Sequence, residues 1–228
     1  MKCRYAAGIA TLSLCLGAAV AQAQYYYQPP EGAGPYFRMG VGPSFFQNSH
    51  MSEPDAAPPS PGTVKYRTGL AADAAFGYAF NKYAALDFEL GYVGAKIDSV
   101  PGYFANNSYV YNVPFLANVT LSYPVPHTIM VPYVGVGVGG ADVIFDADNF
   151  QNIASGDVVD GKENDVVFAW QAFAGVRFQL ARNLSLGIGY KFFATEDPSF
   201  TYPPDNFHVN FDGARTHSVM ASLEWRFW

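Results

Sequence analysis

The last twelve residues of the chain alternate between apolar and more polar side chains. One set of alternate positions is apolar: Val219, Ala221, Leu223, Trp225 and Phe227. The positions between them carry Met220, Ser222, Glu224 and Arg226. Because successive side chains of a strand point to opposite faces, this pattern predicts a strand with one apolar face. Such a face lies either against the core of a soluble sandwich or against lipid on the outside of a membrane barrel.

Seven earlier segments show the same alternation. The predicted strands are at about residues 35–46, 65–80, 83–93, 109–123, 130–143, 165–180, 184–193 and 214–227. In the fifth of these, Val134, Val136 and Val138 alternate with glycine. Glycine on one face lets a neighbouring backbone approach and the sheet bend sharply, as a small barrel requires.

The connections between these strands alternate in length. Those near residues 81–82, 124–129 and 181–183 are short. Those near 47–64, 94–108, 144–164 and 194–213 are long and rich in Pro, Asn, Asp and Gly. Short turns at one end and long loops at the other are typical of an outer-membrane barrel, whereas a soluble sandwich rarely sorts its loops in this way. We therefore predict an all-β fold, an eight-stranded antiparallel up-and-down transmembrane β-barrel over residues 35–228.

The first residues have the pattern of an export signal. Lys2 and Arg4 precede a mostly apolar stretch, and Ala21-Gln22-Ala23 is a small-x-small cleavage site. We predict a cleaved signal peptide over residues 1–23 and a short periplasmic lead-in over 24–34. A membrane anchor is the alternative, although the apolar stretch is short for one. Lipoprotein cleavage at Cys15 is a further alternative, disfavoured because the preceding residue is a bulky leucine.

Cleavage would change both the cysteine count and the charge. The two cysteines, Cys3 and Cys15, lie within the signal, so disulfides, thiol catalysis and cysteine-based metal sites are excluded from the mature chain. Removal of Lys2 and Arg4 leaves 11 Lys and Arg against 19 Asp and Glu, a net charge of −8. This acidic balance argues against nucleic-acid binding.

The inward faces of the predicted strands carry equal numbers of opposite charges. The cations are Arg38, Arg177, Lys191 and Arg226, and the anions are Asp73, Asp87, Glu89 and Glu224. Side chains fill the interior of a narrow barrel, and buried charges there must be paired. The balance favours a structural ion-pair network that plugs the lumen. A narrow channel with charged walls, or a gate that breaks these pairs, is the alternative.

Aromatic residues gather near the two ends of the predicted strands. The set at the short-turn end is Phe80, Tyr83, Tyr123, Phe178, Trp225 and Phe227. The set at the long-loop end is Phe45, Tyr66, Tyr92, Tyr109, Phe168 and Phe192. Two aromatic belts around an apolar band match the two interfaces of a membrane.

Several motifs resemble those of a known family. They are Val131-Pro132-Tyr133-Val134-Gly135-Val136-Gly137-Val138-Gly139, Val113-Pro114-Phe115-Leu116-Ala117-Asn118, Gly189-Tyr190-Lys191-Phe192 and the closing strand from His217-Ser218. In this order and spacing they are similar to the opacity-protein-related surface antigens of the OmpA-like outer-membrane β-barrel family. The resemblance spans residues 35–228. It implies an outer-membrane location, contact with outer-membrane lipids and lipopolysaccharide, and loops exposed to host or environmental ligands.

In that family the terminal aromatic is read by the barrel-insertion machinery. The position that matches it is Phe227, and Trp228 is an additional residue. The resemblance therefore implies a C-terminal assembly signal formed by Trp225, Phe227 and Trp228, with either of the last two as the terminal contact.

Candidate chemistry is sparse. Only His217-Ser218 places a histidine beside a serine, and strand neighbours point to opposite faces, which suits a base and nucleophile badly. The acidic segment 144–164 could bind calcium, but Asp146-x-Asp148-Asn149 lacks the glycine and distal glutamate of a calcium loop. No phosphate-loop, dinucleotide or His-based zinc motif is found, so we expect no cofactor. The predicted role is a structural surface protein, with a small passive porin-like channel as the alternative and a lipid-modifying enzyme less favoured.

Overall fold

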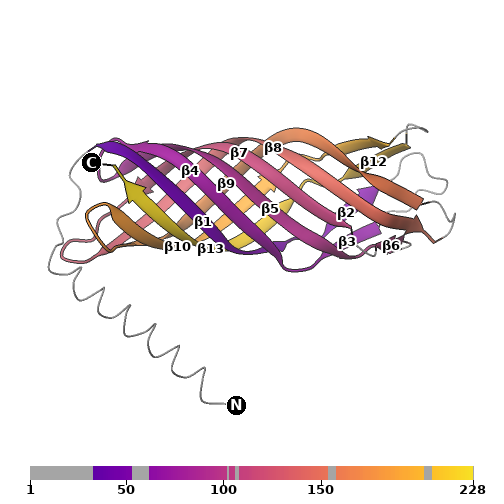
Figure 1. Ribbon diagram of the computed structural model, residues 1–228, viewed down its shortest axis with the longest axis horizontal. Coiled ribbons are helices and arrows are strands. Elements are labelled where there is room, and N and C mark those ends of the chain that lie inside the picture. The colour runs from indigo at the N-terminus through magenta and orange to yellow at the C-terminus, as the bar shows by residue number, and fades with distance from the viewer. Residues whose placement is uncertain are drawn as a thin grey trace, which may run out of the picture.

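The computed structural model is a closed antiparallel barrel (Figure 1). It describes residues 33–52, 62–101, 103–105, 108–153, 158–202 and 207–227. The eight wall strands are β1 (Gly34–Phe46), β4 (Gly69–Ala79), β5 (Ala84–Ser99), β7 (Tyr109–Ser122), β8 (Met130–Asn152), β9 (Val158–Gln179), β10 (Leu184–Thr195) and β13 (Arg215–Arg226). Each pairs with the next, and β13 pairs with β1 from Tyr36↔Arg226 to Phe46↔Thr216, which closes the wall. The predicted fold class is confirmed.

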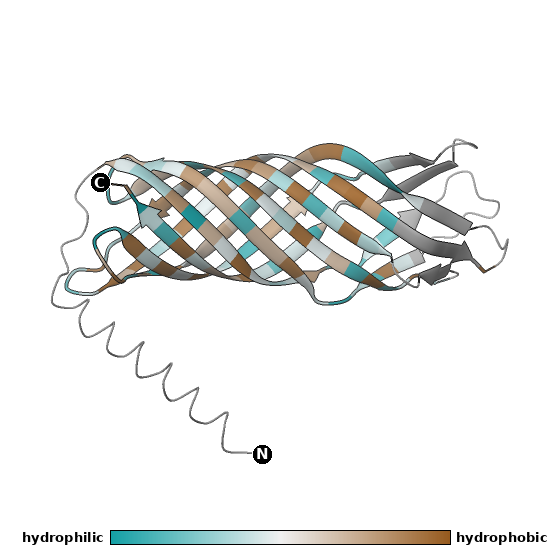
Figure 2. Ribbon diagram, in the orientation of Figure 1, coloured by the Kyte–Doolittle hydropathy of each residue, from teal (hydrophilic) through white to brown (hydrophobic). Residues whose placement is uncertain are grey.

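The two faces of the wall have opposite chemistry, as the alternation predicts. Outward side chains are exposed and mostly apolar, for example Phe76 at 61% and Val136 at 58%, whereas the inward Asn118 is fully buried. Figure 2 shows the resulting alternation of hydrophobic and hydrophilic residues along the strands. An apolar outer surface of this extent is suited to lipid and not to water. No helix in the described ranges is long and apolar enough to cross a membrane.

The long connections contain more strand than the sequence predicts. Five short strands lie there: β2 (Ser49–Ser52), β3 (Gly62–Tyr66), β6 (Tyr103–Ala105), β11 (Ser199–Tyr202) and β12 (Phe207–Phe211). In addition, β8 and β9 remain paired as far as Gln151↔Val158, so most of the predicted loop 144–164 is a hairpin. The pairing continues because the alternation does: Ala141, Val143 and Phe145 are all buried inside the barrel. The Asp, Asn and Gly residues of segment 144–164 led to the wrong prediction of a loop.

The predicted second strand, 65–80, is divided into β3 and β4. Both halves pair with β5, and the register shifts between Lys65 and Tyr66. This shift turns Tyr66 inward, where its hydroxyl lies 2.5 Å from Ser49 Oγ and its ring packs on Phe46. Burial raises the pKa of Tyr66 to about 12. Its predicted place in the outer aromatic belt is therefore wrong.

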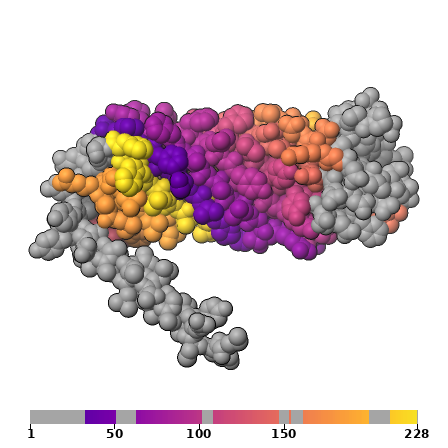
Figure 3. All heavy atoms as spheres, in the orientation of Figure 1, coloured from indigo at the N-terminus to yellow at the C-terminus, as the bar shows by residue number. Residues whose placement is uncertain are grey.

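The interior changes character along the barrel axis. Toward the short turns it is polar and charged. The polar interior residues here include Asn118 on β7, Gln171 on β9 and Lys191 on β10. On each of these strands, the inward residue one step nearer the long loops is apolar: Leu116, Ala169 and Phe193. These three form a buried cluster with Ala141. A second apolar cluster joins Ala71, Val93 and Met220, with Phe46 packed against it. The space-filling view shows a continuous wall of side chains on the face seen (Figure 3).

Candidate functional site: the charged interior

The larger of two charged clusters joins four strands across the lumen. Arg38 on β1 donates to Glu89 on β5 at 2.9 Å and lies 3.5 Å from Asp87. Lys191 on β10 bridges Asp73 on β4 and Glu89, with both N–O distances at 2.6 Å. Asp73 and Lys191 are 118 residues apart in sequence, so only closure of the barrel brings them together. This upper cluster therefore ties one half of the wall to the other.

Neutral side chains complete the hydrogen bonding of the upper cluster. The Tyr36 hydroxyl donates to Asp87 at 2.5 Å. The Asn118 amide donates to Asp87 at 2.7 Å and to Glu89 at 3.2 Å, and Gln171 donates to Asn118 at 2.8 Å. These neutral contacts hold the two carboxylates of β5 in place in addition to their interactions with Arg38 and Lys191.

The smaller cluster lies nearer the short turns. Arg177 on β9 donates to Glu224 on β13 and to the Ser122 hydroxyl on β7. Arg226 donates to Glu224 at 2.8 Å. The Arg177 guanidinium also lies 5.2 Å from the centre of the Tyr133 ring, a cation–π distance. This lower cluster thus holds one carboxylate between two arginines.

Burial makes these pairs costly to break. The side chains of Glu89 and Glu224 are 2% exposed, and even Arg38 and Arg226 are only 12% exposed. Removing one partner from a buried pair leaves an uncompensated charge and typically costs about 3–5 kcal/mol. The upper cluster carries two cations and three anions and the lower cluster two cations and one anion, so the interior is neutral as a whole.

Glycines on the inward face of β8 make room for these side chains. A Cβ on Gly137 would lie 1.9 Å from Asn118 Oδ1, and one on Gly135 would lie 2.3 Å from the Phe173 ring. The glycine stripe is thus filled by side chains from the neighbouring strands β7 and β9. The Phe173 ring in turn lies 5.7 Å below the Arg38 guanidinium carbon.

The structure places all eight sequence-predicted interior charges inside the wall and brings them together in these two clusters. Sequence reasoning missed the roles of Tyr36, Asn118, Gln171 and Tyr133. The available signal was position: Tyr36 lies two residues before Arg38, hence on the same face. Within the described side chains, Asp73 Oδ1 is a buried atom without a hydrogen-bond partner.

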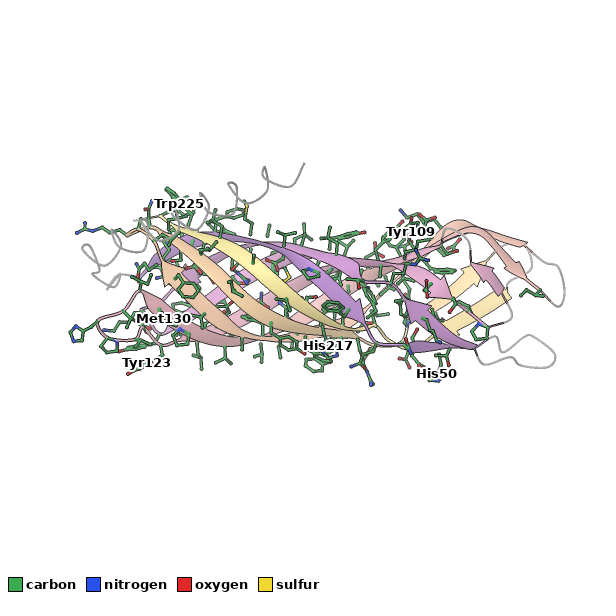
Figure 4. The ribbon with its side chains drawn as sticks, turned by 90° about the horizontal axis from the view of Figure 1, so that it is seen from below. His50, Tyr109, Tyr123, Met130, His217 and Trp225 are labelled. Carbon is green, nitrogen blue, oxygen red and sulfur yellow. The ribbon has the colours of Figure 1, made fainter. Side chains whose placement is uncertain are left out.

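The aromatic residues of the C-terminal strand point outward. Trp225 and Phe227 are 44% and 50% exposed, and Figure 4 shows Trp225 on the outer wall near the short-turn end. The Phe227 amide donates to the Pro35 carbonyl at 3.0 Å, so the strand stays paired to its end. Trp228, the third residue of the predicted assembly signal, lies outside the described residues.

The His217-Ser218 pair is divided between the two faces of the wall. Ser218 is buried inside, whereas His217 faces outward, where Tyr190 and Gln47 approach its two ring nitrogens at 2.5 and 2.7 Å. His217 also packs on the Phe192 ring at 5.2 Å. This geometry gives the histidine a place in an outer aromatic cluster and keeps it from the serine.

The acidic residues of the β8–β9 hairpin are engaged separately. Asp142 accepts a hydrogen bond from Asn164, Asp146 from the Tyr111 hydroxyl, and Asp165 from the Ser199 amide. Within the described part of the chain, no three His, Cys, Asp or Glu side chains gather as metal ligands. The side chains of Asp148, Asp157 and Asp160 lie outside the described residues.

Comparison with known proteins settles the family. The sequence matches the outer membrane protein beta-barrel domain family over residues 9–227. The chain belongs to this family. It is therefore a protein of the outer membrane, and its alternating strands are transmembrane strands. No curated protein sequence matches the chain.

Solved structures share the fold at low sequence identity. OprG from Pseudomonas aeruginosa has a TM-score of 0.55 at 10% identity, covering 88% of this chain and 100% of its own. AlkL has a TM-score of 0.55 at 16% identity, covering 88% and 93%. Neisserial surface protein A has a TM-score of 0.49 at 16% identity, covering 86% and 100%.

Proposed function

We propose that this outer-membrane barrel is closed to solutes and serves as a structural surface protein. Its interior charges hold the wall together and block the lumen, and its extracellular strands and loops contact the environment or a host. The single observation that carries the proposal is the pairing of all eight interior charges in two buried clusters.

The apolar layer above the charges supports closure independently. Leu116 and Phe193 are almost completely buried, and Ala141 and Ala169 pack between them. Water and ions crossing the barrel would have to pass this layer and then separate the ion pairs. Both steps are unfavourable, because the first removes ions from water and the second leaves charges unpaired.

Planar-bilayer conductance of the purified protein tests the proposal against the alternative of a small passive channel. We expect no discrete current steps from the wild type. Arg177→Ala, which leaves Glu224 with one partner, is measured in parallel. Stable current steps from the wild type that change in size in Arg177→Ala would show that the barrel is a pore and would contradict the proposal.

We further propose that the protein is not an enzyme, on the ground that His217 and Ser218 occupy opposite faces of the wall. Mass analysis of the lipid A from cells that express the protein tests this. A mass change that requires Ser218 would overturn it.

A further inference from the structure

A small cavity, which we call the mouth cavity, lies inside the barrel at the long-loop end. Its volume is about 20 Å³, and since a single water molecule needs roughly 10–15 Å³, only a small group fits inside. Phe46 belongs both to its lining and to the packing around the second apolar cluster, so the apolar layer forms its floor. The apolar residues of the lining include Phe46, Tyr66, Val110, Val143, Phe145 and Ala214.

The lining also includes a carboxylate, that of Asp212. The Asp212 side chain is 57% exposed, whereas Val143 and Phe145 are each 3% exposed, so the carboxylate lies on the solvent side of the cavity. The His50 amide donates to Asp212 Oδ2 at 3.0 Å, and His50 Nδ1 lies 3.1 Å from the same oxygen. A donor of a ligand is therefore expected at the other oxygen, Oδ1. Figure 4 shows His50 at the long-loop end of the barrel.

Two further carboxylates flank the mouth cavity on β9. Strand pairing places Glu163 beside Phe145 and Asp165 beside Val143, and residues directly opposite in an antiparallel ladder share a face of the sheet. Both acidic residues therefore lie on the inward face, next to residues that line the cavity.

The lysines and arginines of the described long-loop end lie on the other face of the wall. Lys96, for example, alternates with Ala95 and Ile97, which are both buried inside. The same alternation places all five outward: Lys65, Arg67, Lys96, Lys162 and Arg215. A cation that enters the mouth thus meets carboxylates on the inward face, with His50 as the ionisable base in contact with the lining.

This combination of an apolar cavity and a carboxylate at its solvent side matches a small organic cation. A short hydrocarbon chain fills the apolar part, while an ammonium group stays on the solvent side and donates to the carboxylate. The rings of Phe46 and Tyr66, with centroids 5.2 Å apart, add a favourable surface for positive charge. A neutral molecule of the same shape gains the apolar contacts alone.

We propose that the mouth cavity binds a short-chain primary amine in its ammonium form, with the chain among Val110, Val143 and Phe145 and the ammonium group at Asp212. The site lies on the long-loop side of the apolar layer. It therefore goes beyond the proposal of a closed barrel and does not depend on it, and bilayer conductance tests closure separately.

Methyl NMR of valine-labelled protein in lipid nanodiscs tests the site, with n-propylammonium and its neutral isostere 1-propanol as the two probes. Val110 and Val143 report on the cavity, and Val136 on the lipid face reports on partition into lipid. We expect n-propylammonium to shift Val110 and Val143 saturably and to leave Val136 unchanged. It is expected to bind roughly fivefold more tightly than 1-propanol, the upper end of the range for an exposed ion pair.

Three variants locate the binding. Asp212→Asn is expected to bind n-propylammonium roughly fivefold more weakly and 1-propanol as the wild type does, which shows that the cavity is intact. Asp98→Asn removes a carboxylate from the outer face and is the matched control, with binding expected to equal that of the wild type. Ala214→Leu fills the cavity and is expected to abolish the binding of both probes. The change in electrophoretic mobility on boiling verifies that each variant is folded.

Three results would overturn the site. Equal affinity of the wild type for the two probes would show that the cavity accepts apolar groups without regard to charge. Equal weakening in Asp212→Asn and Asp98→Asn would show a diffuse attraction to an acidic surface. Unchanged binding by Ala214→Leu would place the amine outside the mouth cavity.

Discussion

At the scale of single residues, the interior charges are predictable but their partners are not. Period-two alternation assigns Asp73 and Lys191 to the inward face without any structural information. Their ion pair spans 118 residues of sequence and exists only because β1 and β13 meet. The contribution of Asn118 and Gln171 is equally hidden, because an amide on an inward face gives no sign of which carboxylate it reaches.

Glu224→Gln is expected to lower the free energy of unfolding by about 3–5 kcal/mol, because Arg177 and Arg226 both lose their carboxylate in a buried site. Asp98→Asn is the control, since it breaks the exposed pair with Arg67 and is expected to cost about 0–1 kcal/mol. Urea unfolding in lipid vesicles measures both. Equal losses would mean that the lower cluster is solvated.

At the scale of strands, the sequence predicts all eight wall strands but not their ends. The sequence predicts a loop where the hairpin of β8 and β9 lies, because Asp, Asn and Gly favour turns. Its inward Val143 and Phe145 continue the alternation, and burial of these side chains outweighs the turn preference. The inward turn of Tyr66 could not be predicted, because a register shift reverses the faces of all the residues on one side of it.

Gly137→Ala is expected to destabilise the barrel by about 1–3 kcal/mol, because the new methyl group would overlap Asn118 Oδ1. Ala117→Val, on the lipid face of β7, adds volume where lipid can yield and is the control. Stability is measured as the temperature at which the folded, faster-migrating band is lost in gel electrophoresis. A Gly137→Ala barrel as stable as the wild type would indicate that the glycine stripe is not filled as described.

The loss of stability caused by a lysine on the outer face is expected to depend on the depth of that residue in the membrane. Val136→Lys, in the middle of the apolar band, is expected to cost about 2–4 kcal/mol, and Val166→Lys, near the long-loop end, about 0–1 kcal/mol. Unfolding in vesicles compares the two. A larger cost for Val166→Lys than for Val136→Lys would show that the middle of the membrane does not lie at Val136.

At the scale of the whole molecule, the outer surface and the interior do different work. The outer wall is apolar and contacts the lipid of the membrane. The interior joins the two halves of the wall through buried pairs and is covered by an apolar layer. The sequence predicts this division because lipid on one face and packed polar groups on the other impose strict alternation.

Access to one interior position tests closure most directly. With both natural cysteines in the predicted signal peptide, a single cysteine can be introduced at Ser222, which is 9% exposed and lies between Met220 and Glu224 on the inward face. A small charged thiol reagent is added to intact cells, with Asp98→Cys on the outer wall as the accessible control. A closed barrel predicts rapid labelling of Asp98→Cys and none of Ser222→Cys until the protein is unfolded. Labelling of both at similar rates would contradict a closed interior.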